Sequence, residues 1–94
     1  MRPFMVCWYL IEENKEHVVY EYYPEDHKDK KAGIITIDRI AERIELTQPA
    51  EEDFERYAKE FNERWYYYYD HAKRGIVEDY NNGIINEKGI AAWY

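Results

Sequence analysis

The sequence has little cysteine, proline and glycine, and it lacks a long apolar run. Its one cysteine, Cys7, cannot form a disulfide within the chain, and no CxxC pair or Cys/His ladder is present, which excludes a disulfide framework and a structural zinc site. The longest apolar run, 4–11, is far shorter than the roughly 20 residues that a membrane-spanning helix needs. Two glutamates follow it without a small-residue cleavage site. We therefore expect a protein of the cytoplasm with no membrane span.

Positive charge is also scarce. Lysine and arginine number 13 against 20 aspartate and glutamate residues, which gives a formal net charge of −7. Such a chain repels a polyanion unless its basic residues cluster, and acidic residues interrupt the one basic concentration at 28–31. We therefore expect no nucleic-acid partner. The four glycines are too far apart for a phosphate-binding loop, and no GxGxxG or GKT-type string occurs, so no cofactor is expected.

Apolar and charged residues are both abundant in the sequence. The 94 residues are 46% hydrophobic, 18% aromatic and 35% charged, and no repeat, low-complexity tract or linker interrupts them. A chain of this length seldom divides into two independent cores. We therefore expect one domain over residues 1–94.

Four segments in the first half have the composition and alternation of β-strands, in two successive hairpins. The first has apolar residues at both odd and even positions, which is typical of a strand covered on both faces. The fourth alternates apolar with polar residues and should expose Arg43 and Glu45 to water at a sheet edge. The charged stretch 24–33 begins with Pro24 and predicts a flexible loop. The predicted strands are 4–13, 17–23, 33–38 and 43–47.

The strongest local pattern predicts a helix that starts at Pro49, because proline and acidic residues are favoured in a first helical turn. Acid-before-base pairs four residues apart account for its outer face. Gly75 predicts its end, and 89–94 predicts a last strand that joins the sheet. Apolar residues recur at spacings of three and four and form one stripe that should pack on the sheet: Phe54, Tyr57, Ala58, Phe61, Trp65, Tyr68 and Ala72.

These segments predict an α+β fold of two layers. A mainly antiparallel sheet of four to five strands is packed by one long helix in the C-terminal half, in the order β-β-β-β-α-β. Because one helix covers only one face of a sheet, the second face of the first strand needs either the terminal segment or a second protomer as its cover.

The run Trp65 to Tyr69 is the most unusual segment. On the predicted helix, Tyr66 and Tyr67 point away from the core stripe, and tyrosine is favoured at interfaces. The candidate interface therefore comprises Tyr66, Tyr67, Glu63, Asp70 and His71. The alternative is that both rings lie along neighbouring side chains or under the terminal segment and contribute only to packing.

The same region offers no strong sign of catalysis or metal binding. Asp70 and His71 could in principle transfer a proton, but an exposed helix face normally supplies neither a cleft nor a perturbed pKa. His27 lies near Asp26 and Asp29 without a His-x3-His or carboxylate–His spacing that holds a metal. We therefore predict no catalytic, cofactor-binding or metal-binding residue.

Three hypotheses for function remain. The preferred one is a small acidic, non-enzymatic module that binds a protein partner through exposed aromatic residues. The second is a self-associating structural subunit, a homodimer formed through a sheet edge or the tyrosine face. The third is a small-ligand-binding protein or enzyme with a pocket between helix and sheet, lined by Trp8, Tyr20, Tyr22, Trp65 and Trp93.

Overall fold

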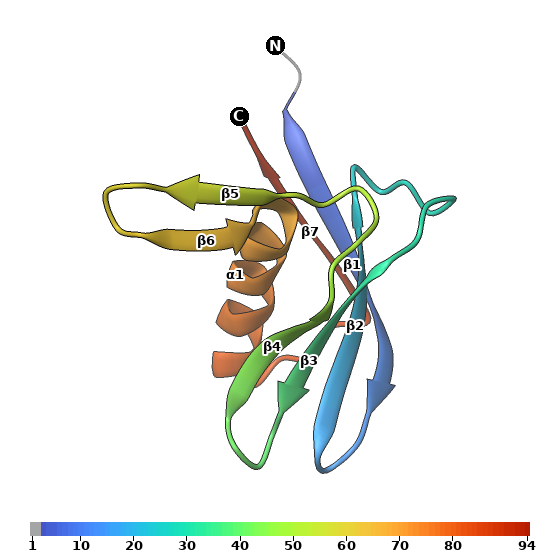
Figure 1. The fold of residues 1–94 in the computed structure, drawn as a ribbon. Helices are drawn as coiled ribbons and strands as arrows, with labels where there is room; N and C mark the ends of the chain where they lie inside the picture. The colour runs from blue at the N-terminus through green and yellow to red at the C-terminus, as the bar shows by residue number, and fades with distance from the viewer. Residues whose placement is uncertain (1–2) are drawn as a thin grey trace.

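The computed structural model describes residues 3–94, and it confirms the α+β fold class. A five-stranded antiparallel sheet has the strand order β4-β3-β2-β1-β7, and a separate two-stranded sheet pairs β5 with β6. The single helix of this range, α1, lies against one face of the larger sheet (Figure 1). The elements are β1 (Phe4–Glu13), β2 (His17–Pro24), β3 (Gly33–Asp38), β4 (Arg43–Gln48), β5 (Glu55–Ala58), β6 (Glu63–Tyr66), α1 (Tyr67–Asn81) and β7 (Lys88–Trp93).

Alternating burial explains the larger sheet. In β2 and β3, every second residue is buried against α1, and the residues between them lie on the opposite face. β4 is an edge strand that exposes Arg43 and Glu45, as predicted. β1 lies between β2 and β7, so the prediction that the terminal segment joins the sheet is also confirmed.

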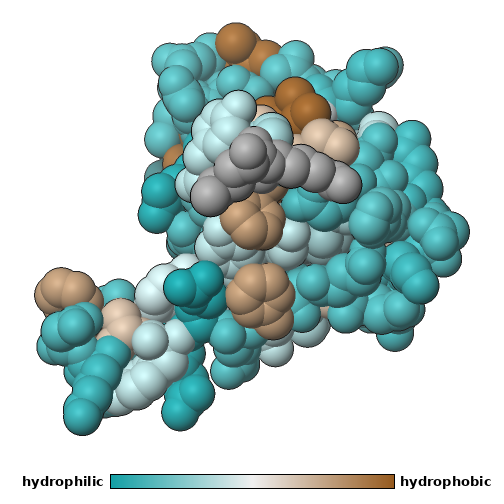
Figure 2. All heavy atoms as spheres, turned by 90° about the horizontal axis from the view of Figure 1, so that it is seen from above, coloured by the Kyte–Doolittle hydropathy of each residue, from teal (hydrophilic) through white to brown (hydrophobic). Residues whose placement is uncertain are grey.

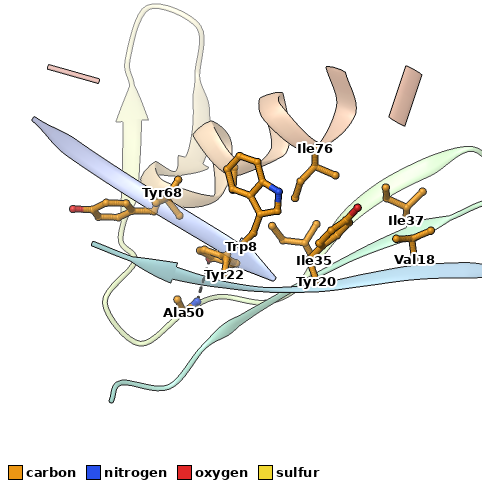
Figure 3. Close-up of a cluster of buried hydrophobic side chains, with 11 residues drawn as sticks. Trp8, Val18, Tyr20, Tyr22, Ile35, Ile37, Ala50, Tyr68 and Ile76 are labelled. Atoms are coloured by element: carbon orange, nitrogen blue, oxygen red, sulfur yellow. Dashed lines mark hydrogen bonds between the residues drawn. The ribbon is translucent and has the colours of Figure 1, made fainter. Parts of the chain in front are cut away.

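The core lies between α1 and this sheet, and Trp8 is at its centre (Figure 3). The indole ring of Trp8 rises from β1 toward the helix. A Cβ atom added at Gly75 of α1 would lie 2.6 Å from the ring, and one added at Gly89 of β7 would lie 2.3 Å from it. Both positions therefore need glycine because Trp8 occupies the space of a side chain there. The other members of the core cluster are Val6, Val18, Tyr20, Tyr22, Ile35, Ile37, Ala50, Tyr68, Ala72 and Ile76.

The predicted helix from Pro49 is wrong over its first half. Residues 55–66 form a β-hairpin, β5–β6, whose turn at 59–62 places Asn62 in the left-handed region with φ 51°. Glu55 therefore approaches Arg64 across the hairpin, at 3.9 Å, instead of pairing along a helix. Of the predicted stripe, Tyr68 and Ala72 face the core as expected. Phe54, Tyr57 and Phe61 are exposed instead. The order is thus β-β-β-β-β-β-α-β, with two strands more than predicted.

The predicted break at Gly75 is also wrong. α1 passes through this residue and ends at Asn81, and the glycine leaves room for the Trp8 ring that packs against the helix. The left-handed residue that follows the helix is Gly83, with φ 76°. Its N–H group donates to the carbonyl oxygen of Tyr80 at 3.0 Å.

The charged loop 25–32, predicted to be flexible, is bonded to three other elements or loops. The Tyr68 hydroxyl of α1 donates to Glu25 at 2.8 Å, and the Tyr9 hydroxyl of β1 donates to Asp26 at 2.6 Å. His27 Nδ1 lies 2.7 Å from a carboxylate oxygen of Glu52. The loop is therefore tied to α1, to β1 and to the segment before β5.

Helix α1 covers only one face of the sheet, as Figure 1 shows. The opposite face carries a mixture of apolar and polar side chains, among them Val19, Ile34 and a pair of threonines, Thr36 and Thr47, whose hydroxyls lie 2.6 Å apart. The terminal segment is therefore part of the sheet and not the cover for this face. No helix within residues 3–94 is long and apolar enough to cross a membrane.

Candidate functional site

The candidate site is built where the β5–β6 hairpin joins the first turn of α1. No side chain at the N-cap residue, Tyr66, caps this helix. The carboxylate of Asp53 does so from the preceding loop, because its two oxygens accept hydrogen bonds from the N–H groups of Tyr68 at 2.8 Å and Tyr69 at 3.0 Å. The N–H group of Tyr67 donates to the carbonyl oxygen of Phe54 at 2.9 Å. Three of the N–H groups that a helix leaves unpaired are thereby satisfied.

Asp53 also connects this helix terminus to the core. The hydroxyl of Tyr22, a fully buried residue of β2, donates to Asp53 at 2.6 Å and accepts a hydrogen bond from the N–H group of Ala50 at 3.1 Å. Burial and the Asp53 carboxylate raise the pKa of Tyr22 well above its ordinary range. The base of the hairpin is therefore fixed to both α1 and the sheet.

Tyr67 is the centre of an aromatic cluster beside this base. Its ring stacks on Phe54 with centroids 5.0 Å apart, and its hydroxyl accepts a hydrogen bond from the indole N–H of Trp93 at 2.8 Å. Phe4 and His71 meet it edge-on. Tyr67 therefore packs against other parts of the chain, as the packing alternative predicts for this residue.

Beyond its base, the β5–β6 hairpin stands away from the rest of the molecule as an arm (Figure 1), which Figure 2 shows from above as a lobe beside the body. Phe61 lies in the turn at its tip and is 73% exposed. Tyr57 is 49% exposed, and the guanidinium group of Arg64 lies 4.8 Å from the centre of its ring. The arm therefore presents aromatic surface that no core of this chain buries.

A cleft of about 470 Å³ lies between the arm and the first turns of α1. Arg56 lies 5.3 Å from the centre of the Tyr67 ring, and Arg74 forms an ion pair with Asp70 at 2.9 Å. The cleft thus combines aromatic walls with charges of both signs. The lining residues are Arg56, Ala58, Phe61, Glu63, Trp65, Tyr67, Asp70, His71 and Arg74.

Four of the five predicted interface residues line this cleft. They are Glu63, Tyr67, Asp70 and His71. Tyr66 does not, because Trp65 faces the cleft and successive residues of a strand point to opposite sides. Tyr66 is half-buried and pairs with Glu55 across the hairpin, and burial and this carboxylate raise its pKa.

His71 is a stacking residue in this arrangement. Its ring lies on the indole of Trp93 at 3.6 Å and is nearly parallel to it, with an angle of 12°. Burial and the nearby charge of Arg74 lower the pKa of His71 below its ordinary 6.5, while Asp70 acts in the opposite direction. Burial and Arg74 therefore favour the neutral form of the ring. The expectation that this helix face has neither a cleft nor a perturbed pKa is therefore wrong, and Asp70 forms its ion pair with Arg74.

The predicted aromatic pocket between helix and sheet does not form as a single site. Trp8, Tyr20 and Tyr22 are buried in the core. Trp93 stacks on His71, and Trp65 lies on the arm. The five rings therefore serve three different parts of the structure.

Sequence reasoning missed Asp53 and Arg56 as site residues, because it placed Asp53 in the first turn of a helix and Arg56 on the outer face of that helix. The local signal that could have placed them is the turn-forming residue Asn62 between 55–58 and 63–66. Within residues 3–94, no three His, Cys, Asp or Glu side chains gather closely enough to hold a metal ion. Comparison with family models, with curated proteins and with solved structures finds no match to this chain.

Proposed function

We propose that this protein is a small non-enzymatic interaction module that binds a protein partner through the β5–β6 arm and the cleft beside it. The observation that carries the proposal is the exposed aromatic surface of the arm, above all Phe61 at its tip. Aromatic residues supply much of the binding energy at protein interfaces, and an exposed group of them is costly unless a partner covers it.

Charge supports a division of roles between the arm and the body. Three acidic and three basic side chains are interspersed over 55–66, so the arm has no net charge, whereas the whole chain has −7. The acidic body attracts a basic partner over long range, and the neutral aromatic arm makes the close contact. The cleft then accommodates a side chain or loop of that partner against Tyr67 and Trp65.

The test compares two exposed apolar residues, each in the turn of a hairpin. Phe61→Ser removes the ring at the tip of the arm, and Ile40→Ser removes a side chain that is 76% exposed in the turn between β3 and β4. Each variant and the parent protein are used to capture partners from the lysate of the native host, and the affinity for the purified partner is then measured by calorimetry.

We expect Phe61→Ser to weaken the partner's affinity by about ten-fold or more, which corresponds to about 1.4 kcal/mol. Ile40→Ser should leave it unchanged, and both variants should keep the parent melting temperature because neither side chain packs in the core. Equal capture by the two variants would refute the role of the arm. Replacement of Tyr67 is unsuitable for this test, since its loss would disturb the aromatic cluster inside the chain.

A further inference from the structure

Strand β7 forms one edge of the five-stranded sheet, and the ladder determines which of its backbone groups point outward. The N–H group of Leu10 donates to the carbonyl oxygen of Glu87 at 2.8 Å, just before β7 begins. Backbone groups of an antiparallel strand point to alternate sides, residue by residue. The groups of Lys88, Ile90 and Ala92 are therefore directed away from β1, toward the free edge.

Lys88 at the start of β7 is its one charged residue, and from Gly89 onward this edge lacks the features that normally protect an edge strand. Such strands are usually interrupted by a bulge, a proline or charged side chains. β7 pairs with β1 in unbroken register, and residues 89–94 contain neither proline nor charge. The opposite edge differs, because β4 carries Arg43 and Glu45 and has a register shift against β3. β7 is thus the edge at which a further strand can add.

We propose that the occupant is β7 of a second copy of this chain, paired antiparallel about a twofold axis into a continuous ten-stranded sheet. With Ala91 of both copies on the axis, Ile90 lies opposite Ala92 of the second copy. The outward-directed N–H and C=O groups of these two residues then face one another and can form hydrogen bonds. The two Lys88 residues are then about 20 Å apart, beyond the range of strong repulsion in physiological salt.

Symmetry favours a second copy over an unrelated strand, and the pairing keeps charged residues away from the contact. Two chains that each carry −7 repel one another over most of their surfaces, and the uncharged stretch 89–94 is a place where they can approach closely. An antiparallel strand pair about a twofold axis is self-complementary by construction. Ile90, which is 61% exposed in the single chain, is covered in the pair.

The test uses a proline at a position where it breaks only the intermolecular pairing. The N–H group of Ala92 points to the free edge, so Ala92→Pro should leave the β1–β7 ladder intact. Ile90→Lys places charge on the same edge, and Ile40→Lys is the matched control on another exposed isoleucine. Sedimentation velocity of each protein over a wide range of concentration gives the dimer dissociation constant, and thermal unfolding reports whether each variant folds.

We expect the parent and Ile40→Lys to form dimers of equal affinity. Ala92→Pro and Ile90→Lys should raise the dimer dissociation constant by about ten-fold or more. Their melting temperatures should equal that of the parent protein at concentrations where it is monomeric. A parent chain that stays monomeric at every concentration would overturn the proposal, as would a dimer that Ala92→Pro leaves intact. Phe61→Ser should dimerise normally, so failure of the arm hypothesis and failure of this one give different results.

Discussion

Replacement of Asp53 should be the most damaging single change outside the apolar core. The carboxylate accepts hydrogen bonds from the N–H groups of Tyr68 and Tyr69 and from the buried hydroxyl of Tyr22. Asp53→Ala removes the cap of α1, which is worth about 1 kcal/mol. It also leaves the Tyr22 hydroxyl without its acceptor inside the protein, at a cost of about 1 to 3 kcal/mol.

The free energy of unfolding should therefore fall by about 2 to 4 kcal/mol, a large share of the roughly 5 to 15 kcal/mol typical of a domain. Urea unfolding followed by tryptophan fluorescence measures it, and the melting temperature should drop by at least about 8 °C. Asp29→Ala, which removes an exposed carboxylate from the neighbouring loop, should change the stability by less than about 0.5 kcal/mol.

A double-mutant cycle separates the two contributions. Tyr22→Phe removes the hydroxyl and leaves the N–H group of Ala50 unpaired. If Asp53 acts on the core through Tyr22, the losses from Asp53→Ala and Tyr22→Phe should sum to more than the loss in the double variant, by about 1 kcal/mol. Additive losses, or a loss below about 0.5 kcal/mol for Asp53→Ala, would refute the reasoning.

Three further predictions concern the core and its titratable groups. Gly75→Ala should lower the free energy of unfolding by about 1 to 2 kcal/mol despite the better helix propensity of alanine, because the new Cβ atom would collide with Trp8. Chemical unfolding measures this loss. Unchanged stability would mean that the Trp8 ring can move aside. The pKa of His71 is below 6.5 in the folded state, so near this pH the folded protein binds fewer protons than the unfolded chain. Stability should therefore fall as the pH drops below about 6.5. His71→Gln should reduce this fall, which urea unfolding midpoints measured from pH 7.5 to pH 5 would show. Burial, followed by Asp79 and Glu13, raises the pKa of Tyr20 to about 12. The contribution of Tyr20 to stability is therefore complete below about pH 10 and is lost as the pH rises toward 12. Tyr20→Phe should reduce this loss of stability at alkaline pH, and an unchanged dependence of stability on pH would contradict the prediction.

The strands of the larger sheet were predictable because a residue's face in a strand depends only on parity. β2 and β4 show the expected alternation, and the segment after Gly89 joins β1 as predicted. The arm was not predictable in this way. Residues 54–66 carry aromatic residues at intervals that suit a helix, and only the turn around Asn62 distinguishes the hairpin from it.

The acidic residues predicted for a first helical turn illustrate a correct chemical inference with the wrong helix. Asp53 does lie at a helix N-terminus, but at that of α1, which begins 14 residues later in the sequence at Tyr67. Local sequence cannot show that a hairpin lies between the two. In the candidate site, Glu63, Asp70 and His71 were selected for their neighbourhood on a helix, whereas the cleft that they line depends on the fold of β5 and β6. Such a contact depends on tertiary structure alone.

Because the Trp8 ring lies between Gly75 and Gly89, substitutions at these three distant positions of the sequence should depend on one another. In a homologue, a smaller residue at position 8 would release the constraint on both glycines, and side chains could then appear at 75 and 89 to fill the vacated volume. Conversely, a tryptophan at position 8 together with glycine at both other positions is a compact signature by which divergent members of the same fold can be found.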